Sequence, residues 1–194
     1  MKSICVYCGS NFNGDSNLLK AIEDLAKTMA TQNITLIFGG GSVGVMGVLA
    51  NEILKGGGKA IGIIPQFLMD KEVGHTGLTE LIITENMHQR KQKMIDLAEG
   101  FVILPGGFGT LEELFEVLTW LQLGLHGKPI GVLNIDGFYD PLFAQMDLMV
   151  KNKFVKQINR DLVFNETDAK VLVNKMKNFD AKPDDVWFRD RNLF

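Results

Sequence analysis

Residues 101–113 read Phe-Val-Ile-Leu-Pro-Gly-Gly-Phe-Gly-Thr-Leu-Glu-Glu, an apolar run followed by a glycine turn and the beginning of a helix. The apolar run predicts a buried strand, and the glycines after it predict a tight turn. Because glycine has no Cβ and accepts positive φ, several backbone N–H groups of such a turn can converge on one anion. The positive end of the helix dipole would lie at the same point. The stretch therefore predicts a strand–turn–helix unit that binds an anion, with the carboxylate of Glu113 one turn into the helix.

The rest of the chain repeats this alternation of strand and helix patterns. Strands that are apolar on both faces and joined through helices are typical of a parallel sheet covered on both sides. We therefore predict one doubly wound α/β domain over residues 1–194, a Rossmann-like fold with a mostly parallel sheet and helices on both faces. Such sheets bind ligands beyond the carboxyl ends of their strands. The expected strands are 3–7, 34–38, 59–64, 81–84, 101–104 and 129–133, and the expected helices are 16–31, 43–54, 87–98, 111–125, 140–152 and 168–177.

Composition and charge exclude several classes of protein. Of the 194 residues, 46% are apolar and 22% are charged, which is ordinary for a globular domain. The formal charge of −3, with Lys and Arg scattered, offers no basic surface for nucleic acid. No run approaches the length of a membrane span, and residues 1–3 lead into a strand without a signal-peptide pattern, so we expect no membrane partner and a cytoplasmic location. The polar tail 179–194 is expected to lie over the surface or fray.

Cysteine and histidine give little support for a metal or redox site. Cys5 and Cys8 form a Cys-x-x-Cys pattern, which could be a redox pair or half of a metal site. Because Cys5 lies inside a predicted strand and no second pair follows, we favour two reduced thiols packed at the strand end. His75, His88 and His126 lie apart in the sequence, so we expect neither a metal nor a cofactor.

A second glycine turn follows the expected strand 34–38. Residues 39–44 read Gly-Gly-Gly-Ser-Val-Gly and satisfy the G-x-G-x-x-G pattern of dinucleotide sites. That reading requires an acidic residue near the end of the next strand, and residues 61–66 contain none. Neither glycine turn contains the Gly-Lys-Ser/Thr of a P-loop. The pattern instead favours a close approach of the backbone to a ligand at Gly40, Gly41 and Ser42, with a purely structural turn as the alternative.

Two interpretations of Thr110 and Glu113 remain open on the sequence alone. Thr110 as the N-cap with Glu113 three residues later would form a capping box worth about 1 kcal/mol. Glu113 could equally be a catalytic carboxylate held beside the bound anion. The two roles are compatible, because a cap fixes the position of the carboxylate. The helix dipole would favour the ionised form of Glu113, which suits a base rather than an acid.

The expected helix 87–98 carries positive charges, opposite in sign to the carboxylate of Glu113 and to the expected anion. Its apolar stripe contains Met87, Met94 and Ala98, and Arg90 and Lys91 project on either side of it, on the core-facing half. Charges placed there should be paired or directed into a cleft, with stems that snorkel at the core edge as the alternative. We expect their partner to be the anion at the glycine turns, since an Arg fork grips phosphate or carboxylate. The residues alone thus indicate a nucleotide or sugar-phosphate site and no named reaction.

Residues 105–113 match a PGGxGTxxE motif, and residues 87–91, Met-His-Gln-Arg-Lys, match a second motif. Together they resemble the Lonely Guy (LOG) family of cytokinin riboside 5′-monophosphate phosphoribohydrolases, once widely mislabelled lysine decarboxylases. The segments 6–10 and 39–47 are also similar to that family. The resemblance implies a homodimer that hydrolyses the N-glycosidic bond of AMP, or of its prenylated form, to the free base and ribose 5-phosphate.

The resemblance also implies roles for individual residues. Arg90 and Glu113 would be the catalytic pair, although their division of labour stays open. The positions that match substrate contacts are Glu72, Lys91, Gly107, Phe108, Gly109, Thr110 and Thr119, and the strand end and glycine turns add Ser10, Gly40, Gly41, Ser42 and Gly106.

Three rival functions are weaker. A nicotinamide-dependent oxidoreductase lacks its acid after the third strand, and a lysine decarboxylase lacks a lysine whose context suits pyridoxal phosphate. A protein that binds a nucleotide as a sensor, without catalysis, is a third rival and is not an enzyme. Release of adenine from AMP would distinguish an enzyme from such a sensor. The sequence leaves open the preference for adenine or prenylated adenine, and the role in hormone activation, purine salvage or nucleotide clean-up.

Overall fold

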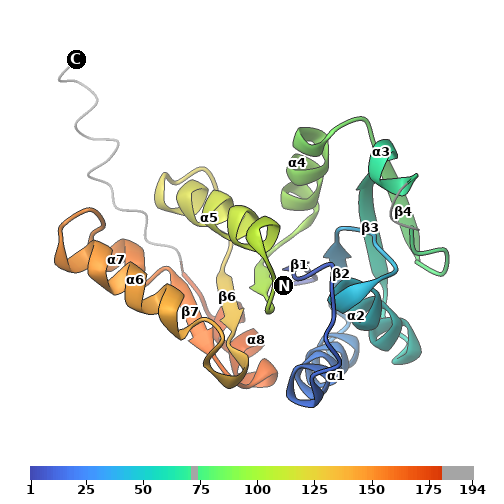
Figure 1. The fold of residues 1–194 in the computed structure, drawn as a ribbon, viewed down its shortest axis with the longest axis horizontal. Helices are drawn as coiled ribbons and strands as arrows, with labels where there is room; N and C mark the ends of the chain where they lie inside the picture. The colour runs from blue at the N-terminus through green and yellow to red at the C-terminus, as the bar shows by residue number, and fades with distance from the viewer. Residues whose placement is uncertain (71–73, 181–194) are drawn as a thin grey trace.

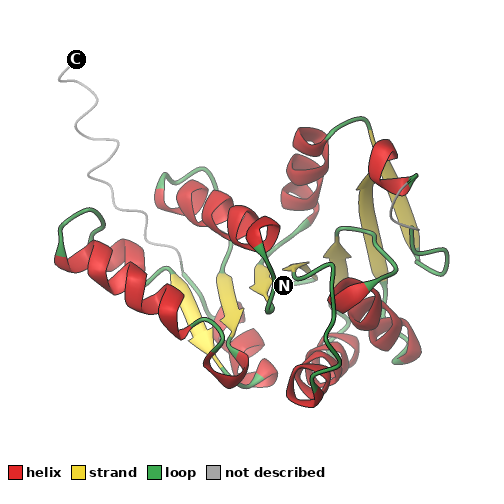
Figure 2. Cartoon of the chain, viewed as in Figure 1, coloured by secondary structure: helices red, strands yellow, loops and turns green. Residues whose placement is uncertain are grey.

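A computed structural model describes residues 1–70 and 74–180. Its seven strands form one sheet in the order β4-β3-β2-β1-β5-β6-β7, and every strand pair is parallel (Figure 2). The predicted doubly wound α/β fold is therefore confirmed. The strands are β1 Ser3–Tyr7, β2 Thr35–Phe38, β3 Ala60–Pro65, β4 Glu80–Thr84, β5 Phe101–Ile103, β6 Ile130–Leu133 and β7 Val163–Glu166. The helices are α1 Ser16–Thr31, α2 Gly44–Lys55, α3 Gln66–Met69, α4 Met87–Leu97, α5 Phe108–Gln122, α6 Asp140–Lys151, α7 Gln157–Arg160 and α8 Ala169–Lys177, with a 3₁₀ turn η1 at Ile135–Gly137.

The order of the strands places a switch point at the centre of the sheet. The chain builds β1 to β4 outward to one edge, returns through α4, and then builds β5 to β7 toward the other edge (Figure 1). Consequently β1 and β5 are neighbours, although α1 leaves β1 toward one half of the sheet and α5 leaves β5 toward the other. In doubly wound sheets the crevice for a ligand opens at the carboxyl ends of the two strands at this point.

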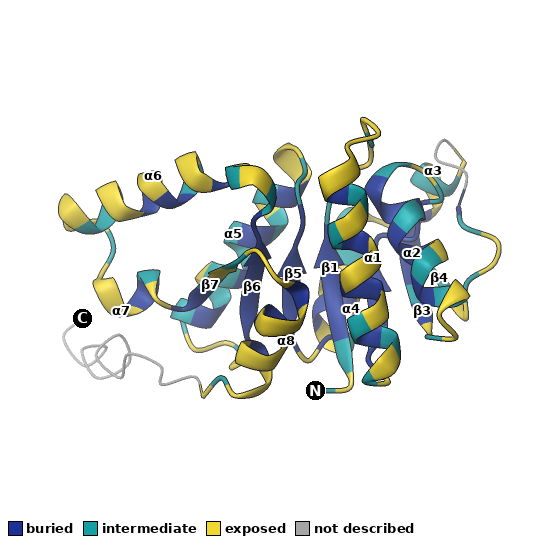
Figure 3. Cartoon of the chain, turned by 90° about the horizontal axis from the view of Figure 1, so that it is seen from below, coloured by how far each residue is buried: buried dark blue, intermediate teal, exposed yellow. Residues whose placement is uncertain are grey.

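Two apolar layers hold the helices against the sheet. Residues of β1 alternate between them: Ile4 and Val6 pack with α1, α2 and α8, whereas Cys5 and Tyr7 pack with α4, α5 and α6. The central strands are buried between these helices, whose outer faces are exposed, whereas the edge strand β4 is only partly covered (Figure 3). Burial on both faces explains why the strand sequences are continuously apolar. Among the described residues, no helix is long and apolar enough to cross a membrane.

One expected helix boundary, and with it the capping box, is wrong. Helix α5 begins at Phe108 rather than Leu111, and its N-cap is Gly107. Thr110 is a buried residue inside the first turn, so it does not cap the helix. Its hydroxyl lies over Gly106, where a Cβ would approach Oγ1 to 2.1 Å. The glycines therefore let the helix begin inside the turn, earlier than the apolar periodicity indicated.

Several short elements lie where no element was expected: α3, η1, α7 and β7. The predicted segments elsewhere agree with the structure to within a few residues. The expectation for the end of the tail, residues 181–194, lies outside the described residues.

Candidate active site

A cavity of about 270 Å³ lies at the carboxyl ends of β1 and β5. Helix α4 forms one wall and the first turn of α5 forms the opposite wall. The cavity is close in size to small-ligand sites, which start near 300 Å³. One side of its lining comes from the strand ends: Tyr7 of β1, then Cys8, Gly9 and Ser10 after it, and Gly39 after β2. The helices supply Met46 of α2, Leu68 of α3, Met87, Arg90 and Met94 of α4, and Gly107, Phe108, Gly109, Thr110, Glu112 and Glu113 around α5.

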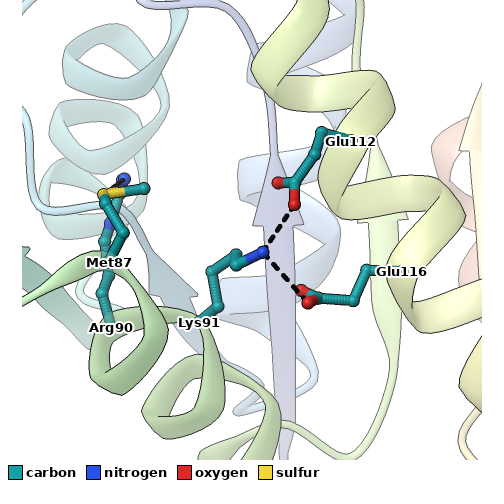
Figure 4. Close-up of polar contacts among 5 residues, drawn as sticks. All are labelled: Met87, Arg90, Lys91, Glu112 and Glu116. Carbon is teal, nitrogen blue, oxygen red and sulfur yellow. Dashed lines mark hydrogen bonds and ion pairs between the residues drawn. The ribbon is translucent and has the colours of Figure 1, made fainter.

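Arg90 projects from the first turn of α4 into this cavity. Its Nε donates a hydrogen bond to the carbonyl of Ile63 at 3.1 Å, and its Nη2 donates to the carbonyl of Gly39 at 3.3 Å. The other terminal nitrogen lies 3.7 Å from Met87 Sδ, and Figure 4 shows the two side chains together. Carbonyl groups orient the guanidinium without neutralising it. Because Arg90 forms no ion pair with a described residue, its positive charge is available to an anionic ligand.

Glu113 lies on the opposite wall of the same cavity. Burial raises the pKa of its carboxyl from 4.5 to about 7, and the nearby positive charge of Arg90 only partly offsets that effect. The helix dipole was expected to favour the ionised form of Glu113, but desolvation has the larger effect on this carboxyl and favours the neutral form. Near neutral pH both protonation states are populated, which allows this carboxyl to exchange a proton with a reactant.

The first turn of α5 supplies hydrogen-bond donors beside these charged groups. Its first intrahelical bond runs from the N–H of Leu111 to the carbonyl of Gly107, at 3.1 Å. The N–H groups of the three preceding residues have no helical acceptor, and all three residues line the cavity. The ring of Phe108 is 94% exposed at this position. A helix of 15 residues that begins at a cavity wall is a favourable site for a phosphate group.

The structure brings Arg90 and Glu113 into one cavity with five of the residues expected to bind substrate: Ser10, Gly107, Phe108, Gly109 and Thr110. Gly106 lines an adjoining hollow of about 310 Å³, which shares Gly9, Ser10 and Gly107 with the cavity. Gly9, Ser10, Gly106 and Gly107 follow the ends of β1 and β5 at the switch point, where the fold class predicts a ligand site.

The glycine turn after β2 is placed differently from the expectation. Gly40 is buried against Ile63 and Leu81, and Gly41 forms an isolated bridge with Gly74. Neither they nor Ser42 belong to the cavity lining. Gly44, at φ +64°, lies so close to the loop after β1 that a Cβ would approach the Ser10 carbonyl to 2.2 Å. At Gly44 the close approach is thus to the chain's own backbone, while Gly39 of the same turn lines the cavity and the ligand contacts of Gly40, Gly41 and Ser42 stay predictions.

Two other predicted residues, Lys91 and Thr119, do not line the cavity, and a third is not among the described residues. Lys91 turns toward α5 and forms ion pairs with Glu112 and Glu116 (Figure 4). Thr119 is exposed on α5, six residues beyond Glu113. Glu72 lies outside the described residues. The roles predicted for these three residues stay predictions.

Sequence reasoning missed several residues of the cavity: Tyr7, Cys8, Met46, Leu68 and Met94. The hydroxyl of Tyr7 is buried and has no hydrogen-bond partner among the described residues. The apolar pattern that marked Tyr7 and Met94 as core residues carries no signal for cavity lining, and α3, which holds Leu68, was not expected. Both cysteines are free, with Cys5 buried and Cys8 partly buried, in agreement with thiols packed at the strand end, and burial raises the pKa of both.

Comparison with known proteins identifies the family. A family model described as "possible lysine decarboxylase" matches residues 46–176. The Arabidopsis thaliana cytokinin riboside 5′-monophosphate phosphoribohydrolase LOG5 is 40% identical over 98% of this chain and 83% of its own length. The chain belongs to the LOG family. The LOG protein of Oryza sativa subsp. japonica is 42% identical over 92% of this chain and 74% of its own length, and these LOG relatives are named as phosphoribohydrolases rather than decarboxylases.

Solved structures share the fold at lower identity. The molybdenum cofactor binding protein of Rippkaea orientalis has a TM-score of 0.65 at 22% identity and covers 92% of this LOG-family chain and 97% of its own. The molybdenum cofactor carrier protein of Chlamydomonas reinhardtii has a TM-score of 0.65 at 19% identity, over 91% of this chain and 96% of its own. At this identity the likeness supports the fold alone.

Proposed function

We propose that the protein is a phosphoribohydrolase that cleaves the N-glycosidic bond of a purine nucleoside 5′-monophosphate. The substrate is AMP or its N6-prenylated form, and the products are the free base and ribose 5-phosphate. The observation that carries the proposal is that Arg90 and Glu113 face one cavity beside the open first turn of α5. The names of the LOG relatives, which specify cytokinin riboside 5′-monophosphates, support this substrate class.

The charges of the cavity suit each part of such a substrate. The free N–H groups of α5 and the guanidinium of Arg90 favour the negatively charged phosphate. Met46, Met87 and Met94 offer an apolar, adaptable wall for the base and for an alkyl group attached to it. Glu113 then faces the ribose, where positive charge develops as the bond breaks.

The reaction needs only water as a second reactant. The electron pair of the C1′–N bond leaves with the base, and a water oxygen forms the new bond to C1′. Ionised Glu113 stabilises the positive charge on the ribose and accepts a proton from that water. Release of this proton to the departing base or to solvent restores the starting state. Arg90 holds the phosphate or offsets the negative charge of the departing base.

The test is release of base from AMP, isopentenyl-AMP, GMP and CMP, followed side by side. Wild-type protein should release adenine or its prenylated form, whereas Glu113→Ala and Arg90→Ala should fold and lose about 10²–10⁴-fold in turnover. Near wild-type turnover in either variant contradicts its catalytic assignment. AMP binding without release of base by the wild type would instead identify a nucleotide sensor.

We also propose that the enzyme is a homodimer in the cytoplasm. Three large apolar residues on one side of α5 are only partly buried by the single chain: Leu111, Phe115 and Leu118. A second copy that covers this side of α5 would remove them from water next to the active-site wall. Thr119 is exposed on α5 and does not line the cavity of the single chain, so it would reach a substrate only across such an interface.

A further inference from the structure

Lys91 is partly buried between the two helices that carry the proposed catalytic pair. Its ammonium lies 2.5 Å from Oε1 of Glu112 and 3.0 Å from Oε1 of Glu116, and its side chain is only 13% exposed. Figure 4 shows Lys91 extending from α4 to both glutamates on α5. Among the side chains that the structure describes, no other hydrogen bond or ion pair joins α4 to α5.

The ion pairs of Lys91 with Glu112 and Glu116 lie next to the proposed catalytic residues in the sequence. Lys91 follows Arg90 on α4, so two adjacent cations point in different directions, one into the cavity and one to α5. Glu112 precedes Glu113, and Glu116 lies one turn later on the same helix. The ion pairs therefore hold α5 at residues on both sides of Glu113.

Glu116 depends on Lys91 for its partner. The second carboxylate oxygen of Glu116 is buried and has no hydrogen bond within the described part of the chain. Without Lys91 the whole carboxylate would be half-buried and unpaired, which disfavours the present packing of α5 against α4. An ion pair of this kind constrains geometry more than it adds stability.

We propose that Lys91 is a positioning residue, which acts by pairing with Glu112 and Glu116 and so holds Glu113 opposite Arg90, rather than by contacting the substrate of its own subunit. This inference rests on the proposed function for its kinetic consequence. The geometric part, that Lys91 fixes the environment of Glu113, stands apart from it.

Electrostatics gives Lys91 a second effect on the same carboxyl. Lys91 lowers the pKa of Glu113, whereas Glu112 and Glu116 raise it. Replacing Lys91 by a neutral residue leaves two unbalanced carboxylates beside Glu113 and should move its pKa upward. The other ionisable groups that face Glu113 are Arg90 from α4, Cys5 and Tyr7 from β1, and Cys8 just after β1.

The first test is a carboxyl ¹³C NMR titration of Glu113 in the wild type, Lys91→Met and Lys91→Arg. We expect the midpoint to move to higher pH in Lys91→Met and to remain near that of the wild type in Lys91→Arg, which keeps the charge. An unchanged midpoint in a folded Lys91→Met protein overturns the proposal. This readout needs no substrate, so it holds whether or not the enzyme assignment is correct.

The second test is a double-mutant cycle of Lys91→Met with Glu116→Gln, read by the midpoint of thermal unfolding. The two changes should be non-additive, whereas an exposed pair within one helix, Lys55→Met with Glu52→Gln, should be nearly additive. Additive effects at Lys91 and Glu116 overturn the proposal.

Kinetics then separates positioning from substrate contact. In Lys91→Met we expect kcat for base release to fall about 10–10²-fold, since small misplacements of catalytic groups have effects of this size. KM should change by less than about threefold if the substrate keeps its binding contacts. A rise in KM with unchanged kcat would instead support a direct contact and overturn the proposal. Failure of the wild type to release any base contradicts only the proposed function.

Discussion

At Glu113, burial and a neighbouring guanidinium act on the pKa in opposite directions. Burial has the larger effect and brings the pKa to about 7, while Arg90 across the cavity limits the rise. A base is most effective when its pKa lies near the working pH, since it is then both available and basic. The position of Glu113 in the wall of a partly apolar cavity is thus what makes it suitable for proton transfer.

The first prediction at this scale concerns the dependence of activity on pH. If ionised Glu113 is the reactive form, kcat/KM for AMP should rise with pH and level off above a midpoint near 7. Initial rates at subsaturating AMP between pH 5 and 9 measure this. A profile that is flat across this interval, or that falls as pH rises through 7, would exclude the base role.

A second prediction concerns stability and requires no substrate. Because the folded-state pKa of Glu113 lies above 4.5, the folded protein binds the proton more tightly, and its free energy of unfolding should fall as pH rises from 4.5 to 7. Glu113→Gln removes this loss. The variant should therefore be more stable than the wild type at pH 8, by up to about 3 kcal/mol, and little different at pH 4.5.

Urea unfolding at the two pH values measures this difference, with exposed Glu23→Gln as the matched control. An equal stability difference at both pH values would show that burial does not perturb Glu113. In that case the pH-rate midpoint near 7 should also be absent.

Sequence reasoning predicted that Arg90 and Glu113 share one site, as they do in the cavity, because each belongs to a short motif with a chemical reason for its residue types. It could not assign the partner of Lys91. The helical periodicity placed Arg90 and Lys91 alike on the core-facing half of α4, and only the packing of α5 separates the cation that faces the cavity from the one that faces Glu116. Tyr7 was missed as a cavity-lining residue because its apolar strand pattern marks it only as part of the core.

At the scale of elements, glycines decide where helices and loops approach one another. Gly39 directly follows β2 and lies against the guanidinium of Arg90. A Cβ at this position would lie 2.0 Å from Nη2 of Arg90 and 3.1 Å from Sδ of Met46. The absence of a side chain at Gly39 is therefore a condition for the position of Arg90, although Gly39 itself carries no chemical group.

Gly39→Ala should accordingly lower activity more than stability. The colliding atom is the end of a flexible side chain, so Arg90 can move away without unfolding the domain, and we expect about a 10²-fold loss of base release. Steady-state rates and thermal unfolding, measured together, test this. Gly77→Ala is the control, because a Cβ there would be at an ordinary contact distance of 3.4 Å from His75. Normal turnover in Gly39→Ala would show that Arg90 need not occupy its observed position.

Long elements with strong periodicity, such as α1 and β1, could be predicted from the sequence to the residue. Short elements could not, since α3 and α7 are each four residues long and carry no repeat of apolar positions. The start of α5 was misplaced because glycines at Gly107 and Gly109 have low helix propensity, and the tertiary setting overrides it.

At the scale of the whole molecule, the alternation of strand and helix predicted a doubly wound sheet but not the order of its strands. The order depends on the return of the chain through α4 to the centre of the sheet, and no local pattern in residues 85–100 encodes that path. The residues that meet at the switch point therefore had to be inferred from motifs.

The proposed homodimer predicts a solution mass of about twice the 21.5 kDa of one chain. The physical reason is the partly buried apolar side of α5, which a single chain leaves in contact with water. Size-exclusion chromatography with light scattering over a dilution series measures the mass. A mass of one chain at every concentration would contradict the proposal and leave Thr119 without a route to the substrate.

The return of the chain through α4 has a consequence for the order in which the protein matures. The pairing of β1 with β5 joins segments almost a hundred residues apart, so it forms only after the intervening β–α units have closed a long loop. Neither the segment before α4 nor the one after it contains both Arg90 and Glu113 with the strand ends that support them. A nascent chain that ends before β5 therefore lacks Glu113 and the second strand end, and catalytic competence requires that both halves have docked.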